Sequence, residues 1–368
     1  MKIDDSRLKA NNNNLIIVRL ILASAVIFSH SYWLVYGLEE QDTVSPLLGR
    51  TISYFAVDGF FFLSGFLVYG SLIRRNDVLS FAKARFFRLW PALAVSTVLT
   101  IAAGFFLTSM PAASYFRGET LRFFGFNLSL QTAAYTLTGV MCGARECSVN
   151  GSLWTIPWEV RCYEGLAVLG LLGLARPRPM ARIILPASFA FALLWHLTPF
   201  AHQPAHGLYF YFLTTDRLWT AFALGIAAFL LRERIPLNWW IALALLVLVI
   251  VEFRLGLNLH LGAVFIGYAV LCGGFLTARN GAIAGRWPDY SYGMYIYAFP
   301  VMLLLGAVYP FGNHWTLSLA NAFATLPLAA LSWHFVEKPV LDWNKRRRVA
   351  TGMARPRKGA GHDEAVAL

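Results

Sequence analysis

The chain has 368 residues, of which 58% are hydrophobic and only 14% are charged, whereas a soluble domain carries about 25% charged residues. Apolar runs long enough to cross a bilayer recur along the whole chain. They exclude an ordinary soluble protein and predict an all-α, polytopic membrane protein. The net charge of +12 is spread over the loops between these runs, so it does not indicate nucleic-acid binding.

Ten apolar segments are predicted to span the bilayer as helices, at residues 15–36, 47–73, 90–109, 152–174, 181–199, 207–231, 236–252, 257–277, 290–309 and 316–336. We expect one integral membrane domain over residues 15–341. A cytoplasmic segment, 1–14, precedes it, and a basic, disordered cytoplasmic tail, 342–368, follows it. The longest connection, 110–151, is expected to be extracytoplasmic and to hold a short helix or re-entrant element at the interface.

Lysine and arginine are concentrated in alternate connections between the predicted spans. With ten spans these connections share one side of the membrane, and they hold Lys2, Arg7, Lys9, Arg74, Arg75, Lys83, Arg85, Arg88, Arg176, Arg178, Arg182, Arg232, Arg234, Arg279, Arg286 and the run from Lys345 to Arg348. The positive-inside rule makes that side cytoplasmic and places both termini there. Because Asp4 and Asp5 interrupt a signal-like N-terminal region, we expect the first span to be retained.

Two of the four cysteines, Cys142 and Cys147, lie in the extracytoplasmic connection. A disulfide between them is possible in an oxidising compartment, but their spacing alone does not decide whether they pair. No Cys and His pattern in the chain is typical of a metal site, so no metal is expected.

The first predicted span, in the segment "VRLILASAVIFSH", carries Arg19 and His30. Eleven residues close three helical turns to within about 20°, so both side chains project from one face, about 16 Å apart along the axis. The arginine is permanently charged and suits a phosphate, while the histidine can accept and release a proton. The alternative is that Arg19 reaches the interface and His30 only packs.

The second span contains "VDGFFFLSGFLV", in which Asp58 is an ionisable group inside the membrane and therefore a functional candidate. Gly59, Ser64 and Gly65 favour close approach of a neighbouring helix. Ser64 is a candidate nucleophile only if a base lies beside it, and nothing in the sequence places such a base.

The segment "RFFRLWP" carries Arg85 and Arg88, three residues apart on one helical face. Pro91 favours the first turn of a helix, so we expect both arginines to precede or open the third span and to form an anion site there. The positive-inside rule alone would also place basic residues here.

The segment "GSLWTIPWEVRCYE" places Ser152, Glu159 and Tyr163 on one face at helical spacing. Glu159 is expected either to orient a histidine or to pair with an arginine such as Arg161 or Arg217. Further along, the adjacent Asp216 and Arg217 point about 100° apart, so each is expected to need a partner on another helix.

Six motifs in order resemble the membrane-bound acyltransferase-3 family, whose members O-acylate bacterial surface glycans. The resemblance covers residues 14–340 and is carried by the arginine–ten residues–histidine pattern, the three segments just described, "SYGMYIYAFPV" at 291–301 and "HFVEKP" at 334–339. Many relatives have a histidine where Ala298 stands, which leaves the acceptor open. Some relatives also carry a C-terminal hydrolase-like domain, and we expect this chain to act without one.

The resemblance implies a membrane O-acyltransferase, most simply an O-acetyltransferase, of the bacterial cytoplasmic (inner) membrane. Acyl-CoA would be the donor, and a hydroxyl of a surface or exported glycan, free or lipid-linked, would be the acceptor. His30 would act as general base, Glu159 would orient it, and Arg19, Arg85 and Arg88 would hold the donor phosphates. The site would also be lined by Asp58, Ser64, Ser152, Trp154, Tyr163, Tyr292 and Tyr295.

Two other functions use the same buried charges. One is a polytopic transporter of glycolipids or small molecules, against which the lack of corresponding broken helices in the two halves of the sequence argues. The other is a scaffold protein of a polysaccharide assembly complex. The sequence leaves open the glycan, the hydroxyl, the acyl group, the existence of a covalent acyl-enzyme and the oligomeric state.

Overall fold

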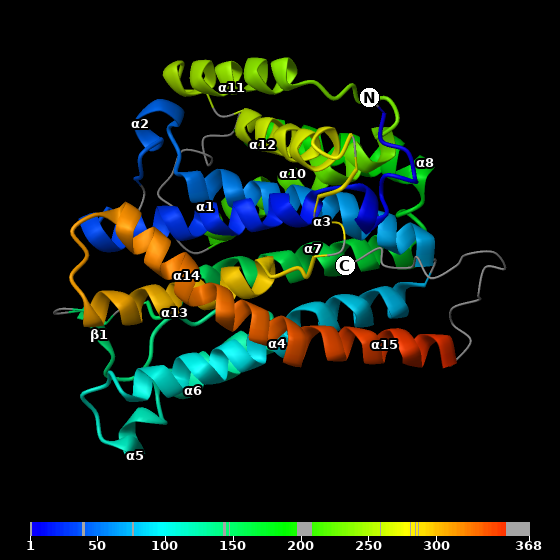
Figure 1. The fold of residues 1–368 in the computed structure, drawn as a ribbon. Helices are drawn as coiled ribbons and strands as arrows, with labels where there is room; N and C mark the ends of the chain where they lie inside the picture. The colour runs from blue at the N-terminus through cyan, green and yellow to red at the C-terminus, as the bar shows by residue number, and fades with distance from the viewer. Residues whose placement is uncertain are drawn as a thin grey trace.

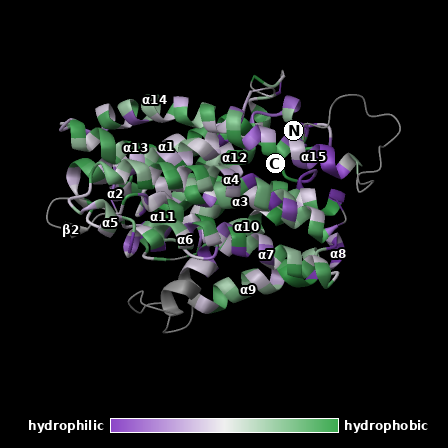
Figure 2. Cartoon of the chain, turned by 90° about the horizontal axis from the view of Figure 1, so that it is seen from below, coloured by the Kyte–Doolittle hydropathy of each residue, from purple (hydrophilic) through white to green (hydrophobic). Residues whose placement is uncertain are grey.

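The computed structural model describes residues 2–38, 41–75, 77–142, 145–146, 148–196, 208–257, 259–279, 281–283, 285 and 287–350. Apart from one two-residue ladder, its regular structure is helical, and most of the long helices run roughly along one direction and pack side by side (Figure 1). Hydrophobic residues dominate the middle of the bundle, while hydrophilic residues gather at the end that holds the N-terminus and the last helix (Figure 2). The prediction of an all-helical membrane protein is confirmed.

The first half of the chain holds two long central helices and the elements of the connection that follows α4. They are η1 (Ala10–Asn12), α1 (Leu15–Tyr36), α2 (Ser45–Leu48), α3 (Ile52–Arg75), α4 (Val78–Phe105), α5 (Ala112–Tyr115), α6 (Glu119–Ser129), β1 (Met141–Cys142), β2 (Arg145–Glu146), the 3-10 turn η2 (Gly151–Trp154) and α7 (Thr155–Leu171). The connection after α4 contains a short helix, α6, which is one of the two alternatives predicted for it. Cys147 lies outside the described residues, and so does its pairing with Cys142.

The second half consists of further helices, and π-helical segments join α8 to α9, follow α12 and join α14 to α15. They are α8 (Pro177–Pro179), η3 (Met180–Ile184), α9 (Leu185–His196), α10 (Leu208–Leu231), α11 (Trp239–Arg254), α12 (Leu261–Leu271), η5 (Cys272–Leu276), α13 (Ser291–Val308), α14 (His314–Ser332), η6 (Trp333–Glu337) and α15 (Lys338–Ala350). Each predicted span overlaps one helix, and these helices are α1, α3, α4, α7, α9, α10, α11, α12, α13 and α14. Among the described residues, α1, α3, α4, α13 and the continuous α14–α15 are long and apolar enough to cross a membrane.

Two predicted boundaries are wrong. Helix α4 begins at Val78 because the carboxylate of Asp77 caps it, accepting hydrogen bonds from the backbone N–H groups of Leu79 and Ser80. Arg85 and Arg88 therefore lie inside the helix, and Pro91 is an interior proline rather than part of the first turn. In addition, α15 continues the last span to Ala350, so residues 342–350 are helical and not disordered.

Helix α3 lies at the centre of the bundle and touches α10 backbone to backbone. A Cβ atom at Gly65 would lie 2.0 Å from the carbonyl oxygen of Phe222, and one at Gly225 would lie 2.0 Å from that of Phe62. The close approach predicted for this stretch of α3 is confirmed. Helix α1 packs against another side of α3 and runs antiparallel to it, with the hydroxyls of Ser29 and Ser53 3.0 Å apart.

Replacing Gly65 by alanine should lower the free energy of unfolding by about 1–3 kcal/mol, because the new methyl group overlaps the backbone of α10. Gly165 of α7 is the matched control, since the nearest atom to a Cβ there is 3.5 Å away on Trp219. Gly165→Ala should raise stability by about 0.5–1 kcal/mol through the helix propensity of alanine. Thermal unfolding in detergent measures both, and equal shifts would contradict the backbone contact.

Candidate active site

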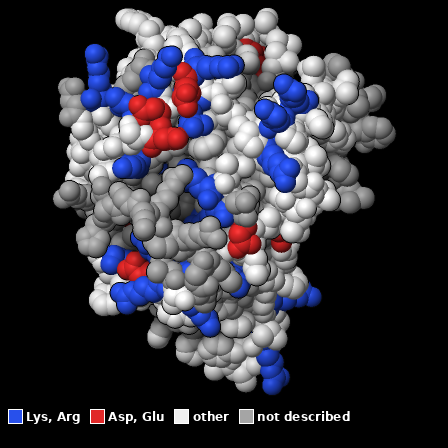
Figure 3. Space-filling model, turned by 90° about the vertical axis from the view of Figure 1, so that its right-hand side faces the viewer, with Lys and Arg blue, Asp and Glu red and all other residues white. Residues whose placement is uncertain are grey.

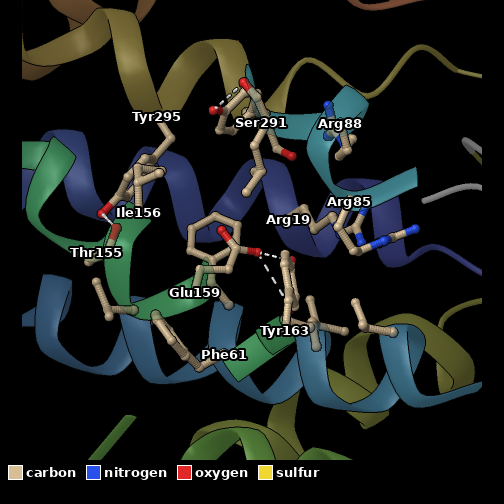
Figure 4. Close-up of a pocket in the computed structure, with 17 residues that line it drawn as sticks. Arg19, Phe61, Arg85, Arg88, Thr155, Ile156, Glu159, Tyr163, Ser291 and Tyr295 are labelled. Carbon is tan, nitrogen blue, oxygen red and sulfur yellow. Dashed lines mark hydrogen bonds between the residues drawn. The ribbon is translucent and has the colours of Figure 1, made fainter. Parts of the chain in front are cut away.

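A cavity of about 100 Å³ lies among α1, α3, α4, α7 and α13, and we call it the charged cavity (Figure 4). It is lined by Arg19, Val57, Phe60, Phe61, Leu63, Ser64, Val68, Arg85, Arg88, Leu89, Thr155, Ile156, Glu159, Tyr163, Ser291, Tyr292 and Tyr295. Most of the residues predicted for the site therefore come together here from five helices. Those that the lining does not include are Asp58, His30, Ser152 and Trp154.

Two of the three arginines of this cavity are held by buried carboxylates. Arg19 lies 2.8 Å from Oδ2 of Asp289, and Arg88 lies 3.1 Å from the same oxygen. Arg88 also pairs with Glu337 in the π-turn after α14. Burial alone would raise the pKa of Asp289, just before α13, but the charges of Arg19 and Arg88 outweigh it and hold that pKa below its ordinary value. This network joins α1, α4, α13 and η6.

The third arginine, Arg85, differs from Arg88 because no carboxylate of the described residues lies within ion-pair distance of it, although Glu159 lines the same cavity. Its residue is only 6% exposed, and its Nε is a buried donor without a hydrogen-bond partner. None of the described residues forms an ion pair with its guanidinium. Because a buried charge is costly unless it is paired, Arg85 is a cation available to an anionic ligand in the cavity.

Glu159 faces Tyr163 and Ser64 across the same cavity. The Tyr163 hydroxyl donates to Oε1 of Glu159, and the Ser64 hydroxyl lies 3.4 Å from that oxygen and 3.0 Å from the Tyr163 oxygen. The structure thus places a carboxylate and a phenol beside Ser64, which the sequence could not do. It does not place Glu159 against His30, because these two hydrogen bonds direct the carboxylate towards α3.

The alternative ion-pair partners proposed for Glu159 are also engaged elsewhere. Arg161 stacks on the ring of Trp158 at 4.4 Å and donates to the carbonyl of Gln131. Arg217 pairs with Asp58 at 2.9 Å. Asp58 was expected to line the site, but this pair instead turns it towards α10, where it fastens α3 to that helix.

The expectation that neighbours in α10 need separate partners is confirmed. Arg217 contacts α3 through Asp58 and also donates to the carbonyl of Tyr54. Asp216 lies 3.0 Å from Nε2 of His260, just before α12.

His30 lies three helical turns along α1 from Arg19 and does not line the charged cavity. Its ring packs edge-on against Phe299 of α13, with 5.1 Å between ring centroids. Arg19 contacts Asp289, just before the same helix, so both side chains of α1 project towards the α13 segment. Within the described part of the chain, no hydrogen bond to the His30 ring is found, which leaves its nitrogens available to a substrate.

The remaining predicted positions lie in the turn η2 and on α13. Ser152 and Trp154 belong to the turn η2, and the Ser152 hydroxyl is buried without a hydrogen-bond partner. Ala298 is buried in a small cluster with Ala23 and Ile27 of α1. A side chain with no polar atoms thus stands where a histidine would offer a second imidazole.

The sequence missed the two carboxylates of the arginine network and Asn150. Asp289 directly precedes the "SYGMYIY" segment, and Glu337 belongs to "HFVEKP", but nothing local identifies their partners.

Figure 3 views the end of the molecule where the chain's N-terminus and α15 lie. Lysine and arginine side chains are spread over this face, and more of them are visible in a recess near its centre.

Comparisons with known proteins agree with this picture. Residues 12–334 match the acyltransferase-3 family, described as an acyltransferase domain. The chain is 30% identical to nodulation protein 10 of Rhizobium leguminosarum bv. viciae over 90% of this chain and 94% of that protein. It is 25% identical to the O-acetyl transferase of Shigella phage Sf6 over 88% of this chain and 94% of that protein. No solved structure matches the chain.

The family match covers most of the chain, including the helices that form the charged cavity and the helix that carries His30. Several of the matched helices are long and apolar enough to cross a bilayer. The chain is therefore a multi-pass membrane acyltransferase that belongs to the acyltransferase-3 family.

Proposed function

We propose that the protein transfers an acyl group, most simply acetyl, from acyl-CoA to a hydroxyl of a cell-surface or exported glycan. The observation that carries this proposal is Arg85, a buried cation that lines the charged cavity and forms no ion pair with any described residue. Arg85 would bind a donor phosphate, while Arg19 and Arg88, held by Asp289 and Glu337, would form the rigid wall beside it.

The protein would cross the bacterial inner membrane ten times, with its basic connections on the cytoplasmic side. The donor would enter the charged cavity from that side. Its anionic head would stay near Arg85, and its acyl arm would extend along α1, past Tyr295, to His30. Glu159, Tyr163 and Ser64 would form the opposite wall of the charged cavity. The relative named O-acetyl transferase supports acetyl as the transferred group.

At His30 the reaction would be a direct acyl transfer. The acceptor oxygen forms a bond to the thioester carbon, and the bond from that carbon to sulfur breaks. The hydroxyl proton passes to the free ring nitrogen of His30 and then to the departing thiolate of CoA. A histidine with no hydrogen bond from the protein can make this transfer as soon as the acceptor hydroxyl approaches.

The reaction is tested with acetyl-CoA that carries a radioactive acetyl group. Membranes that contain the protein should transfer label to polysaccharide, and mass spectrometry should show acetyl esters that are lost when the gene is deleted. A transporter or scaffold protein would leave the glycan unlabelled, and that outcome would contradict the proposal.

Arg85→Ala should raise the apparent KM for acetyl-CoA by about 10–100-fold, because one charge-assisted hydrogen bond to the donor is lost. Its unfolding temperature should not fall, since no carboxylate loses a partner. Arg85→Lys should recover part of the affinity, because it restores the charge without the planar fork. A KM unchanged in Arg85→Ala would show that the donor binds elsewhere.

A further inference from the structure

A second cavity, of about 480 Å³, lies at the end of α1 that is remote from Arg19. We call it the apolar cavity, because residues such as Leu34, Val149 and Leu303 dominate its lining. Along α13, the charged cavity ends at Tyr295 and the apolar cavity begins at Pro300. The residues between them therefore separate two spaces of opposite character.

This separating region, which we call the middle layer, is formed by His30, Asn150, Ser152, Ile296 and Phe299. Phe299 lies between His30 and the turn that holds Asn150 and Ser152. The ring of Phe299 lies 5.1 Å from the His30 ring, and a Cβ atom at the intervening Gly151 would lie 2.8 Å from the same phenyl ring. Phe299 therefore contacts both His30 and the turn that carries Asn150 and Ser152.

The proline of α13 fixes the orientation of Asn150. Pro300 has no N–H, so the carbonyl of Ile296, four residues earlier, cannot make its helical hydrogen bond. Asn150 Nδ2 donates to that carbonyl at 2.9 Å, and the Ser96 hydroxyl donates to it at 3.3 Å. Because a carbonyl can only accept, the amide must present its NH₂ group to Ile296 and its oxygen away from it.

Two buried polar atoms of the middle layer have no hydrogen-bond partner among the described residues. Asn150 and Ser152 are each 1% exposed, and both Oδ1 of Asn150 and Oγ of Ser152 are buried without a hydrogen bond. Buried polar atoms are nearly always satisfied, so two such atoms two residues apart, in a turn that packs on the same phenyl ring as His30, point to a ligand. An orphan amide oxygen calls for a donor such as a hydroxyl, and the serine can donate or accept.

We propose that Asn150 and Ser152 bind the acceptor. Oδ1 of Asn150 would accept a hydrogen bond from one sugar hydroxyl, and the Ser152 hydroxyl would contact the adjacent hydroxyl of the same sugar. The acceptor then enters from the apolar cavity, opposite the donor, and presents its reacting hydroxyl to His30. This inference rests on the proposed acyl transfer and adds to it the side of entry and the residues that select a polyhydroxylated acceptor.

The test measures acetyl transfer from labelled acetyl-CoA to polysaccharide purified from cells that lack the protein, with the concentration of each substrate varied in turn. Ser152→Ala should raise the apparent KM for polysaccharide about 10-fold and leave the KM for acetyl-CoA unchanged. It removes no hydrogen bond made within the protein, so its unfolding temperature should stay equal or rise.

Asn150→Ala should raise the same acceptor KM and also lower the unfolding temperature, because the Ile296 carbonyl loses a donor. Ser96→Ala is the matched control: it removes the other donor to that carbonyl, so it should lower the unfolding temperature without changing the acceptor KM. Wild-type acceptor KM values in both Ser152→Ala and Asn150→Ala would overturn the acceptor site while leaving the transferase intact. Failure of the wild-type protein to label polysaccharide would overturn both proposals.

Discussion

Replacing His30 by alanine should lower acyl transfer by about 10²–10⁴-fold, the usual contribution of a positioned general base. The imidazole is the proton acceptor of the proposed mechanism. It packs edge-on against Phe299, and no hydrogen bond to its ring is found among the described residues. The substitution removes only the edge-on contact with Phe299 and no hydrogen bond, so the fold should persist. Initial rates at saturating acetyl-CoA measure the effect.

The matched control is His314→Ala. His314 lies on α14 at the same end of α1 and packs among the rings of Phe28, Tyr32 and Trp315. Its loss should lower the unfolding temperature and leave the rate within about two-fold of wild type, since it lines neither cavity. Normal transfer by His30→Ala would show that the base is another group and that the mechanism is wrong.

Replacing Arg88 by alanine should have the largest effect on stability, a loss of about 3–5 kcal/mol in the free energy of unfolding. Arg88 bridges the carboxylates of Asp289 and Glu337, which are 2% and 1% exposed. Its removal leaves Glu337 buried without its cation, and Asp289 keeps only Arg19. The expected result is little folded protein in detergent extracts.

Thermal unfolding of Arg88→Ala, Glu337→Gln and the double variant measures how far the pair is coupled. The double variant should be more stable than Arg88→Ala alone, because the neutral amide of Gln at position 337 replaces the buried carboxylate that would otherwise lack a cation. Arg88→Lys should be intermediate, since a single ammonium cannot reach both carboxylates in the geometry of a planar fork. Equal stability of Arg88→Ala and wild type would show that the network does not support the fold.

Sequence reasoning reached the helical architecture because membrane spans are recognised from local composition. Twenty apolar residues make a helix whatever lies around them, since the bilayer offers no other partner for the backbone. The same reasoning predicted that Arg19 and His30 project from one face, because helical geometry repeats within a single segment. It misplaced the start of α4, because Pro91 suggested a first turn there whereas Asp77 caps a helix that begins at Val78.

Which groups remain free for a ligand was decided only by the tertiary structure. Arg85 and Arg88 are three residues apart in one segment. Arg88 is paired with the carboxylates of Asp289 and Glu337, far along the chain, whereas Arg85 forms no ion pair with a described residue. Glu159 likewise turned out to face Tyr163 and Ser64 instead of His30. The sequence by itself determined the helices, the face shared by Arg19 and His30 and the family motifs. The pairing of buried charges depends on which helices become neighbours, because each buried charge pairs with the group that packing places beside it. Only the folded bundle could therefore distinguish the structural ion pairs from the side chains that are open to substrates.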